Sequence, residues 1–159
     1  IVQPSFWNFD ALFTPQDHPA REMQDTFFIK EPNLAKIPNI FADKELIKNI
    51  KETHENGRKT GSIGWRYNWN LDEAKKNVLR THTTVLSAQI LARLKDTDMP
   101  AKFFSVGTVF RNETLDWKHL FEFHQTDCIV VDPDANFKHL LGYLKDFFKN
   151  KEILTVVFS

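Results

Sequence analysis

The sequence predicts an α+β fold in which antiparallel strands are flanked by helices. Residues 103–110 and 123–131 are rich in aromatic and β-branched residues, which favour strands. The short polar connection between these two stretches favours antiparallel pairing. Residues 43–57 and 137–148 carry apolar side chains at helical spacing, one stretch before the strands and one after them. Neighbouring strands with helices grouped around them are typical of this class.

The composition is that of one globular domain. The chain has 159 residues, enough to bury about two-thirds of its unfolded surface, and its 15 Phe and four Trp supply a large aromatic core. Lys and Arg together number 21, as do Asp and Glu, so the net charge is zero. No basic tail or stripe therefore indicates nucleic acid, although zero net charge leaves room for a local basic patch.

The chemistry of the side chains indicates a reducing, aqueous compartment. Cys128 is the single cysteine, so no disulfide can form within the chain. The six His are not closely spaced with one another or with Cys128, so a dedicated zinc site is not expected. No apolar run approaches the ~20 residues that span a bilayer, and residues 1–20 lack a signal-peptide pattern. We therefore expect a soluble, cytoplasmic protein.

The first forty residues predict extended segments, turns and a loop. In residues 1–30 the apolar stretches are short and are broken by Pro15 and Pro19. Residues 31–41 contain two further prolines and predict a loop.

Three helical stretches and a glycine-rich loop follow. Asp43 is placed to cap a helix that ends at Gly57, and residues 57–65 predict a flexible loop. Asn70 with Glu73 resembles a capping box that opens a helix over 71–79. Residues at helical spacing mark one apolar face on each of two stretches: Leu46, Ile47 and Ile50 in the first, and Leu86, Ile90, Leu91 and Leu94 in a helix over 85–94.

The last part of the chain predicts the strand pair, a helix and a final strand. The strands at 103–110 and 123–131 are joined through 114–120, and residues 153–158 predict another strand. The helix between this strand pair and the final strand has an amphipathic pattern. Its apolar face consists of Phe137, Leu140, Leu141, Leu144, Phe147 and Phe148.

The strand pair could present four polar side chains to one concave surface. Side chains alternate across a strand, so Arg111 and Glu113 share a face if the strand extends through them, as Gln125 and Asp127 do on the partner. An arginine offers a planar fork of donors to a phosphate. The carboxylate of Glu113 can accept from an exocyclic amine, while Gln125 and Asp127 can bind an ammonium group.

Spacing alone leaves other interpretations open. An arginine and a glutamate two residues apart are also typical of a solvated strand face with charge pairs. His82, among neighbouring threonines, could hold a polar substrate, but a Thr there could cap a helix while His82 binds a backbone group. Trp117, Lys118 and His119 could contact a nucleotide or simply form an exposed loop.

Three segments of the chain carry a resemblance to a known family. They are SFWNFDALFTPQDHPAREMQDTFF (5–28), GWRYNWNLDEAKKNVLRTHTT (64–84) and FFSVGTVFRNETLDWKHLFEFHQ (103–125), the last with a Phe-Arg-x-Glu signature at 110–113. Together, and in this order, they resemble the α subunit of phenylalanyl-tRNA synthetases of the archaeal and eukaryotic cytosolic type.

The resemblance implies a fold, a reaction and partners. The fold would be a class II aminoacyl-tRNA synthetase catalytic domain, with residues 1–159 covering its N-terminal part from the end of motif 1 through motif 2. The chain would stop before motif 3, so we expect it to be inactive alone. The ligase would use ATP and Mg²⁺ to form phenylalanyl-adenylate and would esterify tRNA(Phe). It would assemble from two α and two β subunits.

The resemblance also implies the roles of eight residues. Arg111 would hold the α-phosphate of ATP, Glu113 would accept from the adenine amino group, and His119 would approach a phosphate from the loop. No residue of this segment is identified as a metal ligand, since the Mg²⁺ would be shared with the phosphates. The residues expected to bind phenylalanine are His82, Thr84, Gln125, Asp127 and Phe28.

One triplet departs from the family pattern. The family has a hydrophobic residue, Glu and Gly where this chain has Thr126, Asp127 and Cys128. Asp127 keeps the charge but is one methylene shorter, and Cys128 should lie on the opposite face of the strand, where we expect packing. This triplet leaves open a related synthetase for another amino acid. The absence of motif 3 leaves open a second alternative, a synthetase-like non-catalytic module that binds a ligand or a protein.

Overall fold

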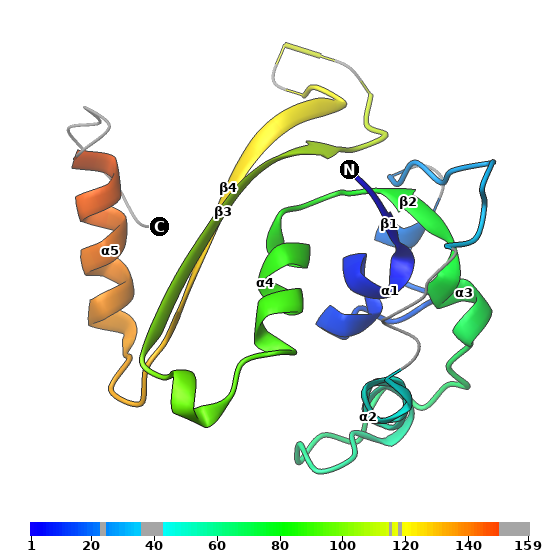
Figure 1. Ribbon diagram of the computed structural model, residues 1–159. Helices are drawn as coiled ribbons and strands as arrows, with labels where there is room; N and C mark the ends of the chain where they lie inside the picture. The colour runs from blue at the N-terminus through cyan, green and yellow to red at the C-terminus, as the bar shows by residue number, and fades with distance from the viewer. Residues whose placement is uncertain (23–24, 36–42, 115, 118, 150–159) are drawn as a thin grey trace. The chain divides into compact units, whose positions relative to one another are not determined.

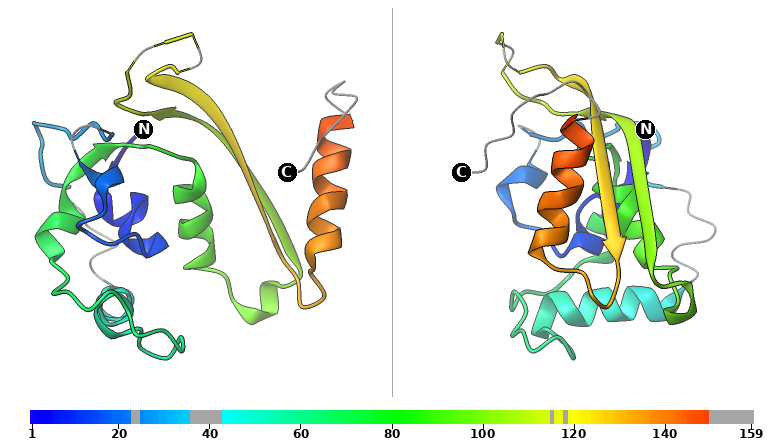
Figure 2. Two further views of the ribbon diagram at one scale, coloured as in Figure 1. Left: turned by 180° about the vertical axis from the view of Figure 1, so that it is seen from behind. Right: turned by 90° about the vertical axis from the view of Figure 1, so that its left-hand side faces the viewer.

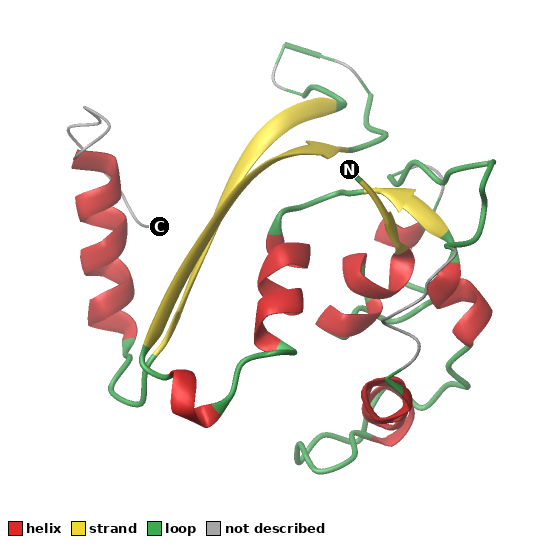
Figure 3. Cartoon of the chain, in the orientation of Figure 1, coloured by secondary structure: helices red, strands yellow, loops and turns green. Residues whose placement is uncertain are grey.

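The computed structural model describes residues 1–22, 25–35, 43–114, 116–117 and 119–149. The chain divides into two compact units, and the strands of its long hairpin run through both. The first unit is Ile1–Leu94 with Phe104–Cys128, and the second is Lys95–Phe103 with Ile129–Ser159. The described residues form helices and two antiparallel strand pairs without a parallel sheet, so the α+β prediction is confirmed (Figures 1 and 3).

The N-terminal segment is more helical than the sequence suggests. It forms β1 (Val2–Pro4), α1 (Ser5–Asn8), and the 3₁₀ turns η1 (Asp10–Leu12) and η2 (Pro19–Arg21). The prediction of extended segments was therefore wrong for much of residues 1–30. All four residues of α1 are buried, which a helical turn inside a core permits and an alternating strand with one solvated face does not.

The next helix, α2 (Lys44–Asn56), has the predicted boundaries. The Asp43 carboxylate accepts from the backbone N–H of Leu46 at 2.9 Å, which confirms the N-cap. Gly57 ends the helix with a φ of 77°, a left-handed conformation that favours glycine. The segment that follows has no helix or strand through Trp65, as expected for a loop.

A short helix and strand replace the predicted helix over 71–79. The helix α3 covers only Leu71–Lys75, and β2 (Asn77–Leu79) follows. β2 pairs antiparallel with β1, with Gln3 opposite Val78. On its other side the chain around Phe28 runs alongside, because Val78 also bridges Phe28. This pairing with two distant segments satisfies the backbone groups that a longer helix would have used.

The capping box predicted at α3 forms only in part. The side chain of Asn70 accepts from the N–H of Asp72 at 2.8 Å, so Asn70 does cap the helix. The reciprocal bond is absent, because the N–H of Asn70 donates to the side chain of Gln16 at 2.8 Å. Glu73 instead pairs with Lys76 at 2.7 Å.

The helix α4 (Thr84–Leu91) is shorter than predicted and buries a different face. Its buried residues are Val85, Ser87 and Ala88, whereas Leu91 is 48% exposed. The predicted apolar face was therefore wrong. The helix lies between α1 and the long hairpin, and the hairpin side is polar, so a simple hydrophobic stripe does not describe it.

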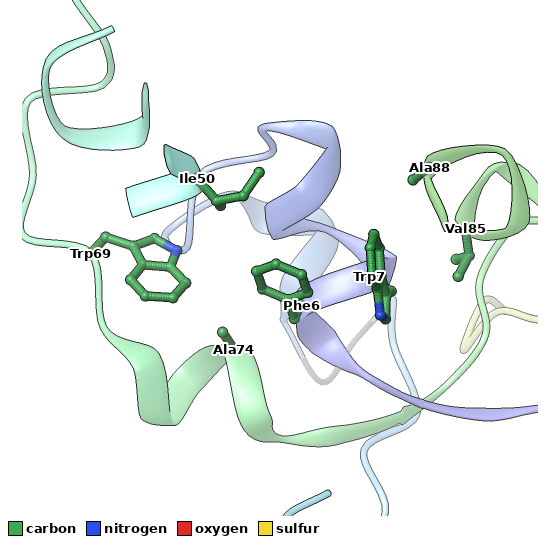
Figure 4. Close-up of a cluster of buried hydrophobic side chains, with 7 residues drawn as sticks. All are labelled: Phe6, Trp7, Ile50, Trp69, Ala74, Val85 and Ala88. Carbon is green, nitrogen blue, oxygen red and sulfur yellow. The ribbon is translucent and has the colours of Figure 1, made fainter. Parts of the chain in front are cut away.

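The hydrophobic core of the first unit gathers around α1. Phe6 and Trp7 contact each other edge to face at 5.1 Å between ring centroids. Figure 4 shows them among side chains from α2, α3, α4 and the segment before α3. The remaining buried members are Ile50, Trp69, Ala74, Val85 and Ala88.

Beside this core lies a buried polar network. The carboxylate of Asp10 is fully buried and accepts from Arg21, Trp69 and Gln16 at 3.1, 2.6 and 2.9 Å. His54, also fully buried, has its Nε2 2.8 Å from the carbonyl of Asp10. These bonds fix the N-terminal segment to the segments around α2 and α3.

Burial of His54 should make the stability of the protein fall in mild acid. Burial lowers the pKa of His54 below its ordinary value of 6.5, and the hydrogen bond to the Asp10 carbonyl only partly offsets this. The unfolded chain therefore takes up a proton as the pH falls through about 6.5, whereas the folded chain does not. We expect the unfolding midpoint to fall between about pH 7.5 and about pH 5.5, with a slope of at most one proton for this residue.

The variant His54→Gln removes this titration and should show a weaker loss over the same pH interval, whatever its midpoint at neutral pH. His139→Gln is the matched control, because His139 is exposed on α5, and it should keep the full dependence. Equal pH dependence in all three proteins, measured by chemical unfolding, would contradict the prediction.

The long hairpin consists of β3 (Ala101–Phe110) and β4 (Glu122–Val131), which run in opposite directions (Figure 2). Both predicted strands are confirmed. Burial alternates along β4, and Gln125 and Asp127 lie on its more buried face. Cys128 lies on the opposite face as predicted, but it is exposed in the described structure, so the expectation of packing there was wrong.

The second unit contains η3 (Asp96–Asp98) and α5 (Phe137–Lys149). The predicted helix is confirmed, and the Nζ of Lys102 lies 4.9 Å from the ring centroid of Tyr143. Several apolar side chains of α5 are exposed, among them Phe137 and Leu140. The strand predicted at 153–158 lies outside the described residues. Among the described helices, none is both long and apolar enough to cross a membrane.

Candidate active site

The junction between β2 and α4, residues 80–84, is held by one buried asparagine. The side chain of Asn8 donates to the hydroxyl of Thr81 at 2.8 Å and accepts from the N–H of Thr81 at 3.1 Å. The backbone carbonyl of Asn8 lies 2.8 Å from Nε2 of His82. The end of α1 therefore fixes both the path of the junction and the ring of His82.

These contacts determine the tautomer of His82. A carbonyl oxygen can only accept, so Nε2 carries the proton and Nδ1 of a neutral ring is an acceptor. Burial lowers the pKa of His82 below its ordinary value, although the hydrogen bond to Asn8 raises it, and the nearby Arg111 lowers it further. Nδ1 is buried and has no hydrogen-bond partner among the described residues. The site thus contains a neutral imidazole with an acceptor still available.

The strand β4 meets this junction through two predicted site residues. The side-chain oxygen of Gln125 accepts from the N–H of Thr83 at 2.8 Å and from its hydroxyl at 3.3 Å. The carboxylate of Asp127 accepts from the hydroxyl of Ser87 at 2.5 Å. Within the described residues, no other hydrogen bond engages the second carboxylate oxygen of Asp127 or the amide nitrogen of Gln125, so both can bind a ligand.

Arg111 and Glu113 lie beyond the end of β3, so the assumption that the strand runs through them was wrong. They are nevertheless neighbours, with Nη1 of Arg111 3.7 Å from an oxygen of Glu113. The guanidinium also lies 5.4 Å from the ring centroid of Phe123, and Nε reaches the carbonyl of Thr81 at 3.4 Å. About two-fifths of the Arg111 side chain stays exposed, so its remaining donors face solvent.

Four predicted site residues therefore converge on one short segment. Arg111 contacts Thr81, while Gln125 and Asp127 contact residues 83 and 87, and His82 lies within the same segment. The opposite effects of Arg111 and Asp127 on the pKa of His82 agree with a cation and an anion both near the ring. Glu113 joins the group through Arg111. We call this group, with the segment 81–87, the junction site.

Within the part of the chain that the structure describes, three predicted residues form no hydrogen bond or ion pair to these side chains. Thr84 begins α4 and is half-buried. Phe28 pairs with Val78 and lines a hollow of about 450 Å³ together with Arg21, Leu34, Lys76 and others. His119 is exposed in the hairpin loop, where Nδ1 lies 2.8 Å from the carboxylate of Asp116. This hydrogen bond raises the pKa of His119.

Sequence reasoning missed three residues that hold the site together. Asn8 stands inside an aromatic run and gave no signal beyond being a polar residue there. Ser87 follows Thr83 by four residues, so helical spacing could have placed both on the face that meets β4. Arg80 is the first residue of the junction, and its side chain is buried against β3.

No metal centre forms from the described residues alone. No group of three or more His, Cys, Asp or Glu is close enough to hold an ion there. The carboxylates of Glu113 and Asp127 are each engaged with a neighbouring side chain instead.

The hairpin with its cluster defines the class of protein. An arginine and a carboxylate follow the first strand, an amide and an acid stand on the second, and helices flank the pair. The resemblance described above assigns residues 103–125 of this hairpin to motif 2 of a class II aminoacyl-tRNA synthetase. Residues 1–156 match the protein family described as tRNA synthetases class II core domain (F), and the chain belongs to this family.

Curated relatives share about half of the residues of this chain. The phenylalanine–tRNA ligase alpha subunit of Dictyostelium discoideum is 51% identical over 160 residues, which cover 100% of this chain and 32% of the relative. That of Methanothermobacter thermautotrophicus is 50% identical, covering 94% of this chain and 28% of the relative. That of Homo sapiens is 49% identical, covering 100% and 31%. The chain thus spans about a third of the length of these relatives.

Proposed function

We propose that this chain forms part of the active site of a phenylalanine–tRNA ligase. The ligase joins phenylalanine to ATP, releases pyrophosphate, and transfers the aminoacyl group to tRNA(Phe). The observation that carries the proposal is the junction site, where a guanidinium, an amide and an acid contact the short segment that carries a neutral histidine. The relatives named as phenylalanine–tRNA ligase alpha subunits support the choice of substrate.

The junction site offers several acceptors to the ammonium group of an amino acid. Asp127 supplies its second carboxylate oxygen. The side-chain oxygen of Gln125 accepts two bonds from Thr83, and in this proposal the ammonium group replaces the longer one, the 3.3 Å bond from the hydroxyl. His82 supplies Nδ1, because its other nitrogen donates to Asn8. Charge-assisted bonds of this kind are the stronger ones in proteins. In this proposal Thr84 lies beside the amino acid and Phe28 lies near its ring.

Arg111 supplies the positive charge for the reacting phosphate. Its outward donors bind the α-phosphate of ATP and stabilise the charge that develops during attack by the amino-acid carboxylate. Glu113 accepts from the adenine amino group, and His119 reaches a phosphate from the loop. The protein in this scheme orients the two substrates and stabilises charge, and none of the named residues acts as a nucleophile.

The Mg²⁺ of the reaction is proposed to enter with ATP. The described residues do not form a set of ligands for a dedicated ion, so the phosphates themselves supply the oxygen ligands in this proposal. The remaining partners are tRNA(Phe) and a β subunit, in an assembly of two α and two β subunits. The proposed location is the cytoplasm.

The departures at 126–128 favour one second candidate, a synthetase for another amino acid. The test measures ATP–pyrophosphate exchange in the complete gene product with phenylalanine, with tyrosine and without an amino acid. Exchange that depends on phenylalanine supports the ligase. Exchange driven by a different amino acid supports the second candidate, and no exchange with any of them favours a non-catalytic binding module.

Removing the charge of Asp127 should weaken the binding of phenylalanine. Replacing Asp127 with Asn keeps the size and an acceptor, but loses a charge-assisted bond to the ammonium group. Such a bond contributes about 1.5–3 kcal/mol, so we expect the KM for phenylalanine to rise about 10- to 100-fold while the KM for ATP changes little. Steady-state exchange kinetics measure both constants.

Asp96→Asn is the matched control, because Asp96 is exposed on η3 and belongs to the other unit. It should leave both KM values unchanged. Equal KM values for phenylalanine in wild type and Asp127→Asn would remove Asp127 from the proposed ammonium site.

A further inference from the structure

Arg80 is a buried cation held by the backbone of β3. It is 8% exposed, and its Nε and Nη2 donate to the same acceptor, the carbonyl of Thr108, at 3.2 and 2.9 Å. No ion pair to Arg80 occurs within the described residues. A buried guanidinium without a carboxylate partner is costly unless backbone groups satisfy it. The carbonyl of Thr108 is therefore the group that keeps Arg80 in this position.

The backbone of Arg80 forms two further hydrogen bonds, one to β3 and one to the N-terminal residue. Its carbonyl accepts from the N–H of Phe110 at 2.8 Å, and its N–H donates to the carbonyl of Ile1 at 3.0 Å. Side chain and main chain together thus fasten this residue to β3 at Thr108 and at Phe110. Three hydrogen bonds join Arg80 to Thr108 and Phe110, in the last three residues of β3 before Arg111.

Gly107 provides the room for this contact. A Cβ at position 107 would overlap Nη2 of Arg80 and lie 3.0 Å from Cζ. Gly107 does not have a positive φ, so glycine is required here for space and not for backbone conformation. The guanidinium therefore lies directly against the bare backbone of β3.

The segment that Arg80 fastens is the one that organises the junction site. Thr81, the next residue, accepts from Arg111, and Thr83 donates to Gln125. A shift of Arg80 relative to β3 would move the junction against the strand end that carries Arg111.

We propose that Arg80 is a positioning residue, whose guanidinium, seated against Gly107, sets the distance between Arg111 and the 81–83 segment. The proposal rests on the function proposed above, because it assigns the consequence of the contact to that reaction. In this proposal Arg80 contacts neither substrate, because its side chain is buried and donates to Thr108. It acts through Arg111 and Gln125, and a misplacement of about 1 Å at such groups can lower a rate about 100-fold.

The test uses two variants that disturb the contact from opposite sides. In the complete gene product, Gly107→Ala introduces the overlapping methyl, and Arg80→Lys removes the planar fork while keeping the charge. Alanine is ordinarily the better residue inside a strand, so a loss from Gly107→Ala points to the clash with Arg80. Gly142→Ala is the control, because nothing lies within 4 Å of a Cβ there.

We expect each variant to lower kcat/KM for phenylalanine-dependent exchange about 10- to 100-fold, with a raised KM for phenylalanine. A purely structural role would lower the concentration of active sites and leave that KM unchanged. The combined variant should lose little more than the worse single variant, because both changes disrupt one contact. Losses that multiply in the combined variant, or an unchanged KM in both single variants, would overturn the proposal.

Amide hydrogen exchange separates this proposal from the proposed function. Gly107→Ala should speed exchange at the N–H groups of Phe110 and Thr83 about ten-fold relative to Gly142→Ala, whether or not the protein is a ligase. If the wild type shows no phenylalanine-dependent ATP–pyrophosphate exchange, the proposed function fails. The hydrogen-exchange rates of the two amides then decide whether Arg80 positions the segment. Unchanged rates at both amides refute the positioning role.

Discussion

The variant Arg111→Ala is expected to lose most of the adenylate-forming activity of the complete gene product. The guanidinium at the end of β3 is the cation proposed to meet the α-phosphate, and its outward donors are free to do so. Removing one preorganised donor to developing charge typically lowers kcat about 100- to 1,000-fold. ATP–pyrophosphate exchange at saturating phenylalanine and ATP measures the loss.

Arg111→Lys should recover part of this loss, because it keeps the charge but not the planar fork. Arg93→Ala is the matched control, since Arg93 is exposed after α4 and forms no ion pair within the described residues. If Arg111→Ala retains more than about a tenth of the wild-type kcat, the proposed role is wrong, because the expected effect is at least ten-fold larger.

The variant Asp10→Ala is expected to cause the largest loss of stability. The carboxylate of Asp10 is fully buried, and the side chain of Arg21 that it pairs with is only 6% exposed. Its removal also leaves the indole N–H of Trp69 without its acceptor. Taking one partner from a buried ion pair costs about 3–5 kcal/mol, because the other charge stays buried and uncompensated.

The measurement is the chemical unfolding midpoint of the complete gene product, supported by its resistance to a protease. Asp10→Asn should lose less, since the amide oxygen can still accept from Trp69. Asp72→Ala is the control: its carboxylate is 78% exposed and pairs with Lys75 on the surface, so less than about 1 kcal/mol is expected. An Asp10→Ala protein no less stable than Asp72→Ala would show that the buried network contributes nothing.

The local signals in the sequence predicted the elements whose cause is local. Asp43 and Gly57 bound α2 because a cap and a left-handed glycine act on the helix that they adjoin. The two long strands were predicted for a similar reason, since β-branched and aromatic residues are enriched in them. The motif-based resemblance placed Arg111, Gln125 and Asp127 in one site, and the structure brings these three to the same segment.

Two of the incorrect predictions, the helix over 71–79 and the buried face of α4, share one cause, which is pairing with distant segments. β2 forms in place of a longer helix because β1 and the chain around Phe28 supply its hydrogen bonds. The buried face of α4 differs from its apolar stripe, since Ser87 on this face donates to Asp127 on β4. Such partners lie about forty residues away or more, beyond the reach of helical or strand periodicity.

The sequence by itself determined the class of fold, the boundaries of α2, and the residue types that could bind an amino acid and ATP. Only the tertiary structure decided that Asn8 fixes the tautomer of His82, and that Gly107 makes room for Arg80. The physical reason is that hydrogen-bond geometry and steric room depend on which distant backbone lies within about 3 Å, whereas helix caps and side-chain alternation depend on neighbours in the chain.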